Sequence, residues 1–261
     1  MVSPFRQHQL QVRAALAAGT AFAGAALPEI DDANPAAAEY RQLLASLHND
    51  LRALHDIQSV DGKIERKRAM ITAYQPWVVG ALAAGTATDA GPGTAVQDEI
   101  VATMLVWALD LLDWANAVAI AEHMLRHGVT LPERYKRDVA TFLVDRVADT
   151  AKATPEAVSL DLAREVLALT ADRDMPDQAR AKLHRAIGLR LMDDAANFDP
   201  SAETALAGGK AALVDAALAA LTEALRLDQN VGVKKQIEQL TRDAKKLAAD
   251  AGATASLAQQ E

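Results

Sequence analysis

Residues 98–114 read DEIVATMLVWALDLLDW, and residues 115–132 continue with ANAVAIAEHMLRHGVTLP. In both segments apolar side chains and small alanines recur at helical spacing. Gly128 is suited to end the second helix, and Pro132 follows shortly after it. The two segments therefore predict a pair of helices packed against each other, with Trp107 and Trp114 as large anchors of their core.

The composition extends this prediction to the whole chain. Of the 261 residues 51% are hydrophobic but only 4% are aromatic, and much of the apolar content is alanine. Alanine favours helix and lets helices approach closely, so we predict an all-α fold. Further paired helices are expected over 131–248, and AALAALTEALRLDQN, 216–230, resembles the second helix of a tetratricopeptide (TPR) unit with its exit turn. The repeats are irregular, so the prediction is a TPR-like stack of α-hairpins.

Segments without apolar periodicity suggest where domains begin and end. The clearest is AAGTATDAGPGTAVQD, 83–98, which we interpret as a linker. Residues 1–34 are expected to form a flexible N-terminal arm and residues 251–261 a disordered tail. A helical DNA-binding and oligomerisation region would then occupy 35–82, and the TPR-like domain 99–250.

A heptad-like seam marks the helix expected after Pro35, which Asn34 would cap. Apolar residues alternate there at spacings of four and three. They are Tyr40, Leu44, Leu47, Leu51 and Leu54. Such a seam fits an amphipathic helix that packs on its own domain, and it also fits a self-association helix. The two interpretations can both hold, and we assign the five residues to oligomerisation.

A basic cluster follows the turn SVDG at 59–62. GKIERKRAM, 62–70, holds four cations against the single acid Glu65, although the chain has a formal net charge of -8. Residues 1–75 are neutral, with eight Lys or Arg and eight Asp or Glu, so the whole negative charge lies beyond them. Two helices joined by a short turn are also the minimum frame of a helix-turn-helix. We therefore predict DNA phosphate contacts here and in the N-terminal arm. The residues are Arg6, Arg13, Arg52, Lys63, Arg66, Lys67 and Arg68.

Several classes of function are disfavoured. GPGTAV, within the predicted linker, lacks the Lys-Ser/Thr of a phosphate-binding loop, and GGKAAL, 208–213, has Ala211 where Ser or Thr should bind magnesium. The chain contains no cysteine, which excludes disulfides and thiolate chemistry. No stretch approaches the roughly 18 apolar residues of a membrane span. Polar residues interrupt the N-terminal apolar stretch, so we expect no export signal.

Candidate catalytic residues are sparse. His123 and His127 stand four apart and could share a metal, but no third ligand is evident. A two-metal nuclease site needs acids that converge from different elements. The acids considered are Asp110, Asp113, Asp145, Asp193 and Asp194. Solvated or helix-capping roles explain them better, so we assign no catalytic residue, no metal site and no cofactor.

Several ordered blocks together resemble the small terminase subunit of peduovirus-type temperate contractile-tailed bacteriophages. The resemblance runs, with gaps, over most of residues 1–246. The blocks are MVSPFRQHQLQVRAA at 1–15, PWVVGAL at 76–82, MLVWALDLLDWANAVAIAEHMLRHGVTLP at 104–132, MPDQARAKLHRAIGL at 175–189 and LDQNVGVKKQIEQL at 227–240. This family is commonly labelled terminase, endonuclease subunit.

The resemblance implies a role in viral DNA packaging in the cytoplasm of a bacterial host. Small terminase subunits recognise the packaging site on double-stranded viral DNA, assemble as ring-like homo-oligomers and pass the DNA to a large ATPase subunit. The family often has a basic C-terminal tail, but here no Lys or Arg follows Lys246. DNA binding is therefore expected to depend more on the N-terminal part.

Two alternatives stay open. The chain could be a true DNA endonuclease subunit with its own metal site, although no nuclease motif is seen in it. It could also be a TPR-like scaffold that binds only protein. Cutting is expected to be done by the large subunit, or only in complex with it.

Overall fold

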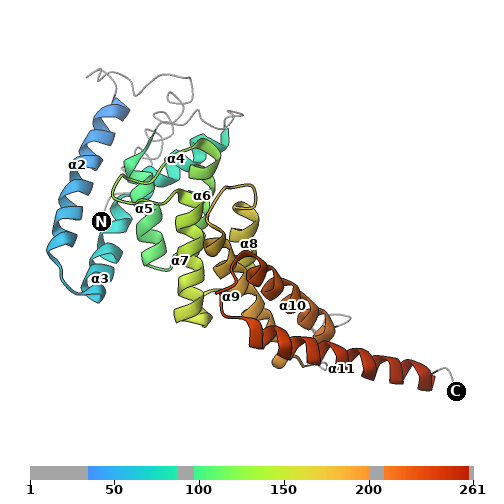
Figure 1. Ribbon diagram of the computed structural model, residues 1–261. Coiled ribbons are helices and arrows are strands. Elements are labelled where there is room, and N and C mark those ends of the chain that lie inside the picture. The colour runs from blue at the N-terminus through green and yellow to red at the C-terminus, as the bar shows by residue number, and fades with distance from the viewer. Residues whose placement is uncertain (1–34, 88–96, 200–208, 259–261) are drawn as a thin grey trace. The chain divides into compact units, whose positions relative to one another are not determined.

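The computed structural model describes residues 35–87, 97–199 and 209–258 (Figure 1). These residues form helices and connecting turns and contain no β-strand, so the predicted all-α class is confirmed. The chain divides into two compact units, residues 1–140 and 141–261, and each is described by itself. None of the described helices is both long enough and apolar enough to cross a membrane.

The first unit is built around the helices of residues 98–132. Its elements are α2 (Pro35–Asp56), α3 (Val60–Met70), the 3-10 turn η1 (Ile71–Ala73), α4 (Gln75–Ala87), α5 (Glu99–Asp110) and α6 (Trp114–His127). As predicted, α5 and α6 pack on each other. Gly128 ends α6 with φ 70°, a left-handed conformation that glycine adopts without a steric penalty.

Helix α5 forms the centre of the first unit. All of its residues from Ile100 to Leu109 are buried, because α2, α4 and α6 pack around it. Trp107 is 1% exposed and meets the ring of Tyr74 edge-on, with 5.9 Å between the ring centroids. The helices of the predicted 35–82 region thus share one core with the helices that follow the predicted linker.

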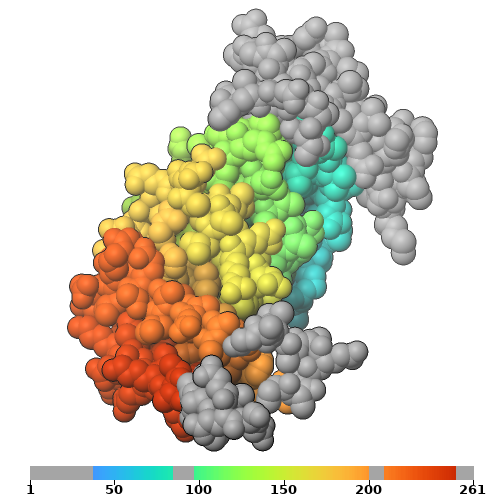
Figure 2. Space-filling view, turned by 90° about the vertical axis from the view of Figure 1, so that its right-hand side faces the viewer, coloured from blue at the N-terminus to red at the C-terminus, as the bar shows by residue number. Residues whose placement is uncertain are grey.

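The second unit consists of α7 (Val139–Ala153), whose first two residues precede the division, the 3-10 turn η2 (Pro155–Ala157), α8 (Leu160–Leu169), α9 (Asp177–Ala196), α10 (Gly209–Leu227) and α11 (Lys234–Ala258). α10 packs along both α9 and α11. The space-filling view shows one outer face of these helices, with α10 in orange and α11 in red (Figure 2).

A glycine sets the close approach of α9 and α10. A Cβ added at Gly188 would lie 2.4 Å from Cδ2 of Leu221, and Leu221 is fully buried. It would also lie 3.2 Å from the Leu221 backbone nitrogen, which cannot rotate away. The two helices can therefore keep this spacing only while position 188 has no side chain.

Gly188→Ala is expected to lower the free energy of unfolding of the second unit by about 1–3 kcal/mol, since overpacking outweighs the better helix propensity of alanine. The loss is measured by far-UV circular dichroism during urea unfolding. Adding Leu221→Ala provides room for the new methyl group, so the double variant should lose less than the sum of the single variants. Additive losses would contradict the contact.

Several predicted segments fall partly or wholly outside the described residues. The predicted arm, 1–34, lies outside them. Of the predicted linker, residues 83–87 belong to α4 and residues 88–96 lie outside. The predicted tail at 251–261 begins inside α11, which continues to Ala258.

Candidate nucleic-acid interface

Helix α3 carries the basic cluster, and a serine fixes its start. Ser59 caps the helix, and its hydroxyl oxygen accepts a hydrogen bond from the Gly62 backbone N–H at 3.1 Å. A Cβ at Gly62 would lie 2.7 Å from that oxygen and 3.1 Å from the Ile57 side chain. The predicted turn at 59–62 is therefore shorter than expected: it occupies 57–59, and VDG forms the first turn of α3.

The four cations of the cluster are not equivalent. Arg66 and Arg68 are exposed and Lys63 is partly buried, and these three make no ion pair with any residue in the described part of the chain. Lys67 instead forms an ion pair with Asp110 at the end of α5. Three cations of α3 can therefore meet a polyanion without first breaking an ion pair.

The Lys67–Asp110 pair joins α3 to the central helix. The two side chains are only 16% and 19% exposed, so water screens their attraction less than it would on an open surface. A DNA contact by Lys67 stays a prediction, but its ammonium group already has a partner inside the first unit. The sequence did not indicate that partner, which lies 43 positions away.

The heptad-like seam of α2 faces the core of the same unit. Leu47 is completely buried and Leu54 is 6% exposed, whereas Leu44 and Leu51 are partly exposed. The Tyr40 ring lies 5.3 Å from the Trp77 ring, measured between centroids. The first of the two interpretations therefore describes this helix, and oligomerisation through the five seam residues stays a prediction.

Hydrogen bonds reinforce this packing. The Tyr40 hydroxyl oxygen accepts from the Glu99 backbone N–H at 3.2 Å, and the Tyr74 hydroxyl donates to Asp50 at 2.7 Å. Burial raises the pKa of both tyrosines, and the neighbouring carboxylates raise it further. Both phenols therefore stay neutral and hold α2 against α4 and α5.

Asp98, the last residue of the predicted linker, is a structural residue. Its Oδ1 accepts from the backbone N–H groups of Ile100 and Val101 at 2.9 and 3.0 Å, which caps α5. Its Oδ2 accepts from the Trp77 indole N–H at 2.8 Å. Desolvation raises the pKa of this carboxyl although the three donors lower it. An aspartate directly before an apolar helical run was the available signal.

The remaining DNA-contact residues are less constrained. Arg52 is exposed on α2 and hydrogen-bonds the Asn49 side chain, with a second bond of 3.4 Å from Nε to the His48 carbonyl oxygen. It lies on the helix that leads into the turn before α3. Arg6 and Arg13 lie outside the described residues.

The acids considered for catalysis do not come together. Asp110 pairs with Lys67, and Asp113 caps α6. In the second unit Asp145 accepts from Lys182 at 3.1 Å and Asp194 from Arg190 at 3.1 Å, while Asp193 accepts from Asn197. Within the described ranges, no three His, Cys, Asp or Glu side chains are placed to hold a metal ion.

The two histidines of α6 lie side by side. Their ring centroids are 4.7 Å apart, and His127 is 1% exposed. Burial, together with the charges of His127 and Arg126, lowers the pKa of His123 to about 4. His123 is therefore neutral at physiological pH, and charging it disfavours the folded state.

This low pKa predicts a loss of stability in mild acid. The unfolded histidine has a pKa of 6.5, so between 6.5 and about 4 the unfolded chain binds the extra proton. Stability is full above that window and falls as the pH drops through it. We expect a loss of about 2 kcal/mol between about pH 7 and about pH 5 in urea unfolding. His123→Gln should remove this part of the pH dependence, and an unchanged profile would contradict the assignment.

Comparisons with known proteins place these features in a family. A family model described as "Phage small terminase subunit" matches residues 44–178, which include α3 and the α5–α6 pair. The chain is also 37% identical over 250 residues to the "Terminase, endonuclease subunit" of Escherichia phage P2, covering 94% of this chain and 87% of that protein. No solved structure matches. The chain belongs to the phage small terminase subunit family.

Proposed function

We propose that this chain binds double-stranded viral DNA at the packaging site and assists a large ATPase subunit in cutting the genome and packaging it into the capsid. The observation that carries the proposal is the surface of α3. There Arg66, Arg68 and Lys63 stand without ion-pair partners among the described residues, in a chain that belongs to the small terminase family. The host cytoplasm is the proposed place of action.

The three cations suit phosphate contacts. Arg and Lys side chains on a short helix can reach successive phosphates and so position the protein on the duplex, while base readout needs further contacts in a groove. Helix α3 follows a turn after α2 and is anchored to the core by Lys67–Asp110, so it would meet DNA as a rigid element. Arg52, on the preceding helix, would add a phosphate contact.

Assembly would strengthen this contact. We propose a ring-like homo-oligomer in which each subunit repeats the α3 surface, because linked weak contacts bind far more tightly than one. The helices of the second unit would form a TPR-like platform that binds the large subunit, since stacked helical hairpins present extended surfaces to proteins. In the scaffold alternative, the chain binds only protein and does not bind DNA.

The test measures binding of the purified chain to fluorescent duplexes by anisotropy. One duplex contains the phage packaging site and the other has the same composition in scrambled order. We expect binding to both at low salt, a steep loss with rising salt, and a preference for the packaging site. No binding to either duplex at low salt, together with normal binding to the large subunit, would favour the scaffold alternative.

A second candidate function is that of a nuclease. It is favoured by the name of the Escherichia phage P2 relative, "Terminase, endonuclease subunit". The test incubates the purified chain alone with packaging-site DNA and Mg²⁺. Cleavage that a single Asp or Glu substitution abolishes would establish it, and intact DNA would assign cutting to the large subunit or the complex.

A further inference from the structure

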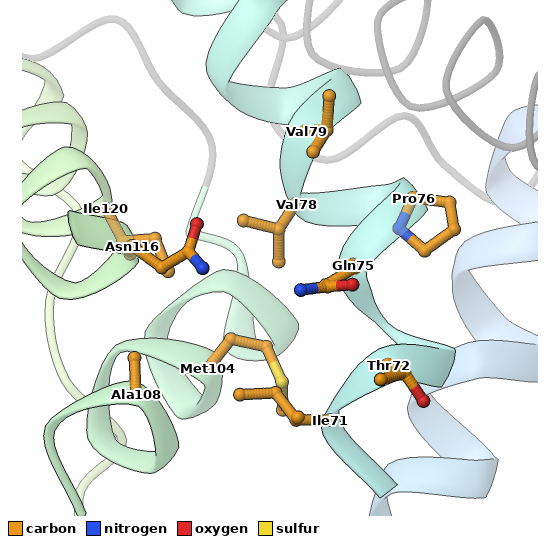
Figure 3. A pocket seen from close by; sticks show the side chains of 10 residues that line it. All are labelled: Ile71, Thr72, Gln75, Pro76, Val78, Val79, Met104, Ala108, Asn116 and Ile120. Atoms are coloured by element: carbon orange, nitrogen blue, oxygen red, sulfur yellow. The ribbon is translucent and has the colours of Figure 1, made fainter. Parts of the chain in front are cut away.

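The first unit contains an apolar groove, with α4 on one side and helices α5 and α6 on the other (Figure 3). Its volume is about 310 Å³. Ile71, Val78, Met104 and Ile120 provide apolar walls, and the amide groups of Gln75 and Asn116 point toward each other across it. A groove of this size can accept an aliphatic side chain with part of its backbone.

Exposed aliphatic residues mark this groove and one other place. Among the described residues the large hydrophobic side chains that stand exposed are Val60, Val79 and Leu112, at 74%, 51% and 43%. Val79 lines the groove, and Leu112 lies in the turn after α5, four residues beyond Ala108, which also lines the groove. Val60 is the first residue of α3. The first unit therefore presents an aliphatic knob at Val60 and an apolar groove elsewhere.

The knob and the groove belong to different patches. From Val60 to Ile71, the lining residue nearest to it in the sequence, there are eleven residues of nearly continuous helix, which span about 17 Å at 1.5 Å per residue. Val60 therefore cannot fill the groove of its own chain. The knob of one subunit in the groove of the next, repeated head to tail, generates rings or filaments, whereas reciprocal insertion between two copies would close a two-fold dimer.

We propose that Val60 of one subunit inserts into the Ile71–Val79 groove of a second copy of this chain. The proposal deepens the proposed function, since it names the surface through which the assembly forms. Leu47 and Leu54 of the α2 seam are already buried within the subunit, so self-association needs apolar surface that the folded chain leaves exposed.

Charge complementarity supports a second copy as the occupant. Exposed Asp61 adjoins Val60, while exposed Arg68 stands one helical turn before Thr72 at the edge of the groove. When Val60 is seated, Asp61 of one copy approaches Arg68 of the next. A rim pair adds little affinity but fixes orientation, and the guanidinium keeps further N–H donors for phosphate.

Cysteine cross-linking tests the contact directly, because the native chain contains no cysteine. The full-length Val60→Cys/Val79→Cys variant is oxidised with diamide and examined on a non-reducing gel. We expect a ladder of covalent oligomers. A mixture of the two single variants should give covalent dimers only, and each single variant alone should stay monomeric. Ala69→Cys/Val79→Cys moves the first cysteine to another exposed face of α3 and serves as the control.

Native mass measurement provides the second readout. The wild-type chain should assemble beyond a dimer, and Val60→Asp should raise the concentration for half-dissociation at least about tenfold, because it places a charge in an apolar groove. Val60 is exposed in the single chain, so folding should not change. Cross-linking no stronger than in the control, covalent dimers of Val60→Cys alone, or a monomeric wild type would overturn the proposal.

The same samples separate this proposal from the DNA-binding function. Anisotropy with a duplex at low salt measures DNA binding independently of the ladder. A ladder without DNA binding would leave the contact standing and refute the proposed function. DNA binding by an assembly that does not form the Val60–Val79 cross-link would refute the contact and leave the proposed function standing.

Discussion

Asp98→Ala is expected to lower the free energy of unfolding of the first unit by about 3 kcal/mol. The substitution removes the N-cap of α5, which is typically worth about 1 kcal/mol. It also leaves the Trp77 indole N–H without its acceptor in a site where Trp77 is 3% exposed. An unsatisfied buried donor costs a further 1–3 kcal/mol or so. The loss is large because α5 is the helix around which α2, α4 and α6 pack.

Tryptophan fluorescence during urea unfolding measures this loss in the first unit alone. All three tryptophans of the chain, Trp77, Trp107 and Trp114, lie there. Asp113→Ala is the matched control, since Asp113 also caps a helix but through a longer bond of 3.4 Å to the Asn116 N–H. The control should lose about 0.5–1 kcal/mol. Equal losses in the two variants would show that the Trp77 bond contributes nothing.

The central hairpin could be predicted because its signals are local. The apolar run of 100–109 and the glycine at 128 are properties of neighbouring residues, and they indicate helices directly. The division of the chain into domains was harder to predict from the sequence. Gly and Pro at 91–93 signal a break in the helix, but whether the flanking helices share a core depends on contacts such as Trp77–Asp98 that no periodicity encodes.

The candidate interface shows the same limit at the level of single residues. The sequence identifies four cations on α3, but it does not show which of their side chains pair with other helices and which face solvent. Lys67 meets Asp110, a residue of another helix, while Arg66 meets solvent. The α2 seam is a parallel case, because a heptad spacing describes the apolar face of a helix and not the molecule that covers it. Leu47 is covered by the chain itself.

Replacing Lys63, Arg66 and Arg68 together with Ala is expected to weaken DNA binding about 100-fold near physiological salt. Each phosphate contact adds about 0.9 to the slope of log affinity against log salt, so the slope should fall by about 3. Anisotropy titrations over a range of salt concentrations measure both quantities. Lys234, Lys235 and Lys245 of α11 are exposed, and replacing them removes the same charge far along the chain. An equal loss in that control would show that net charge, not α3, determines binding.

The Lys67→Met variant tests whether Lys67, which forms an ion pair with Asp110, stabilises the fold or binds DNA. The substitution keeps the aliphatic stem but removes the ion pair between Lys67 and Asp110 at the end of α5, so the first unit should lose about 1–2 kcal/mol in tryptophan-monitored unfolding. Asp110→Asn in the same chain should restore part of that loss. The affinity and salt slope for DNA should stay near wild type, because the ammonium group is held by Asp110 and not offered to phosphate. A fall in the slope of about 1 with unchanged stability would instead place Lys67 on the DNA, and α3 would then have to turn that side chain away from the core to bind.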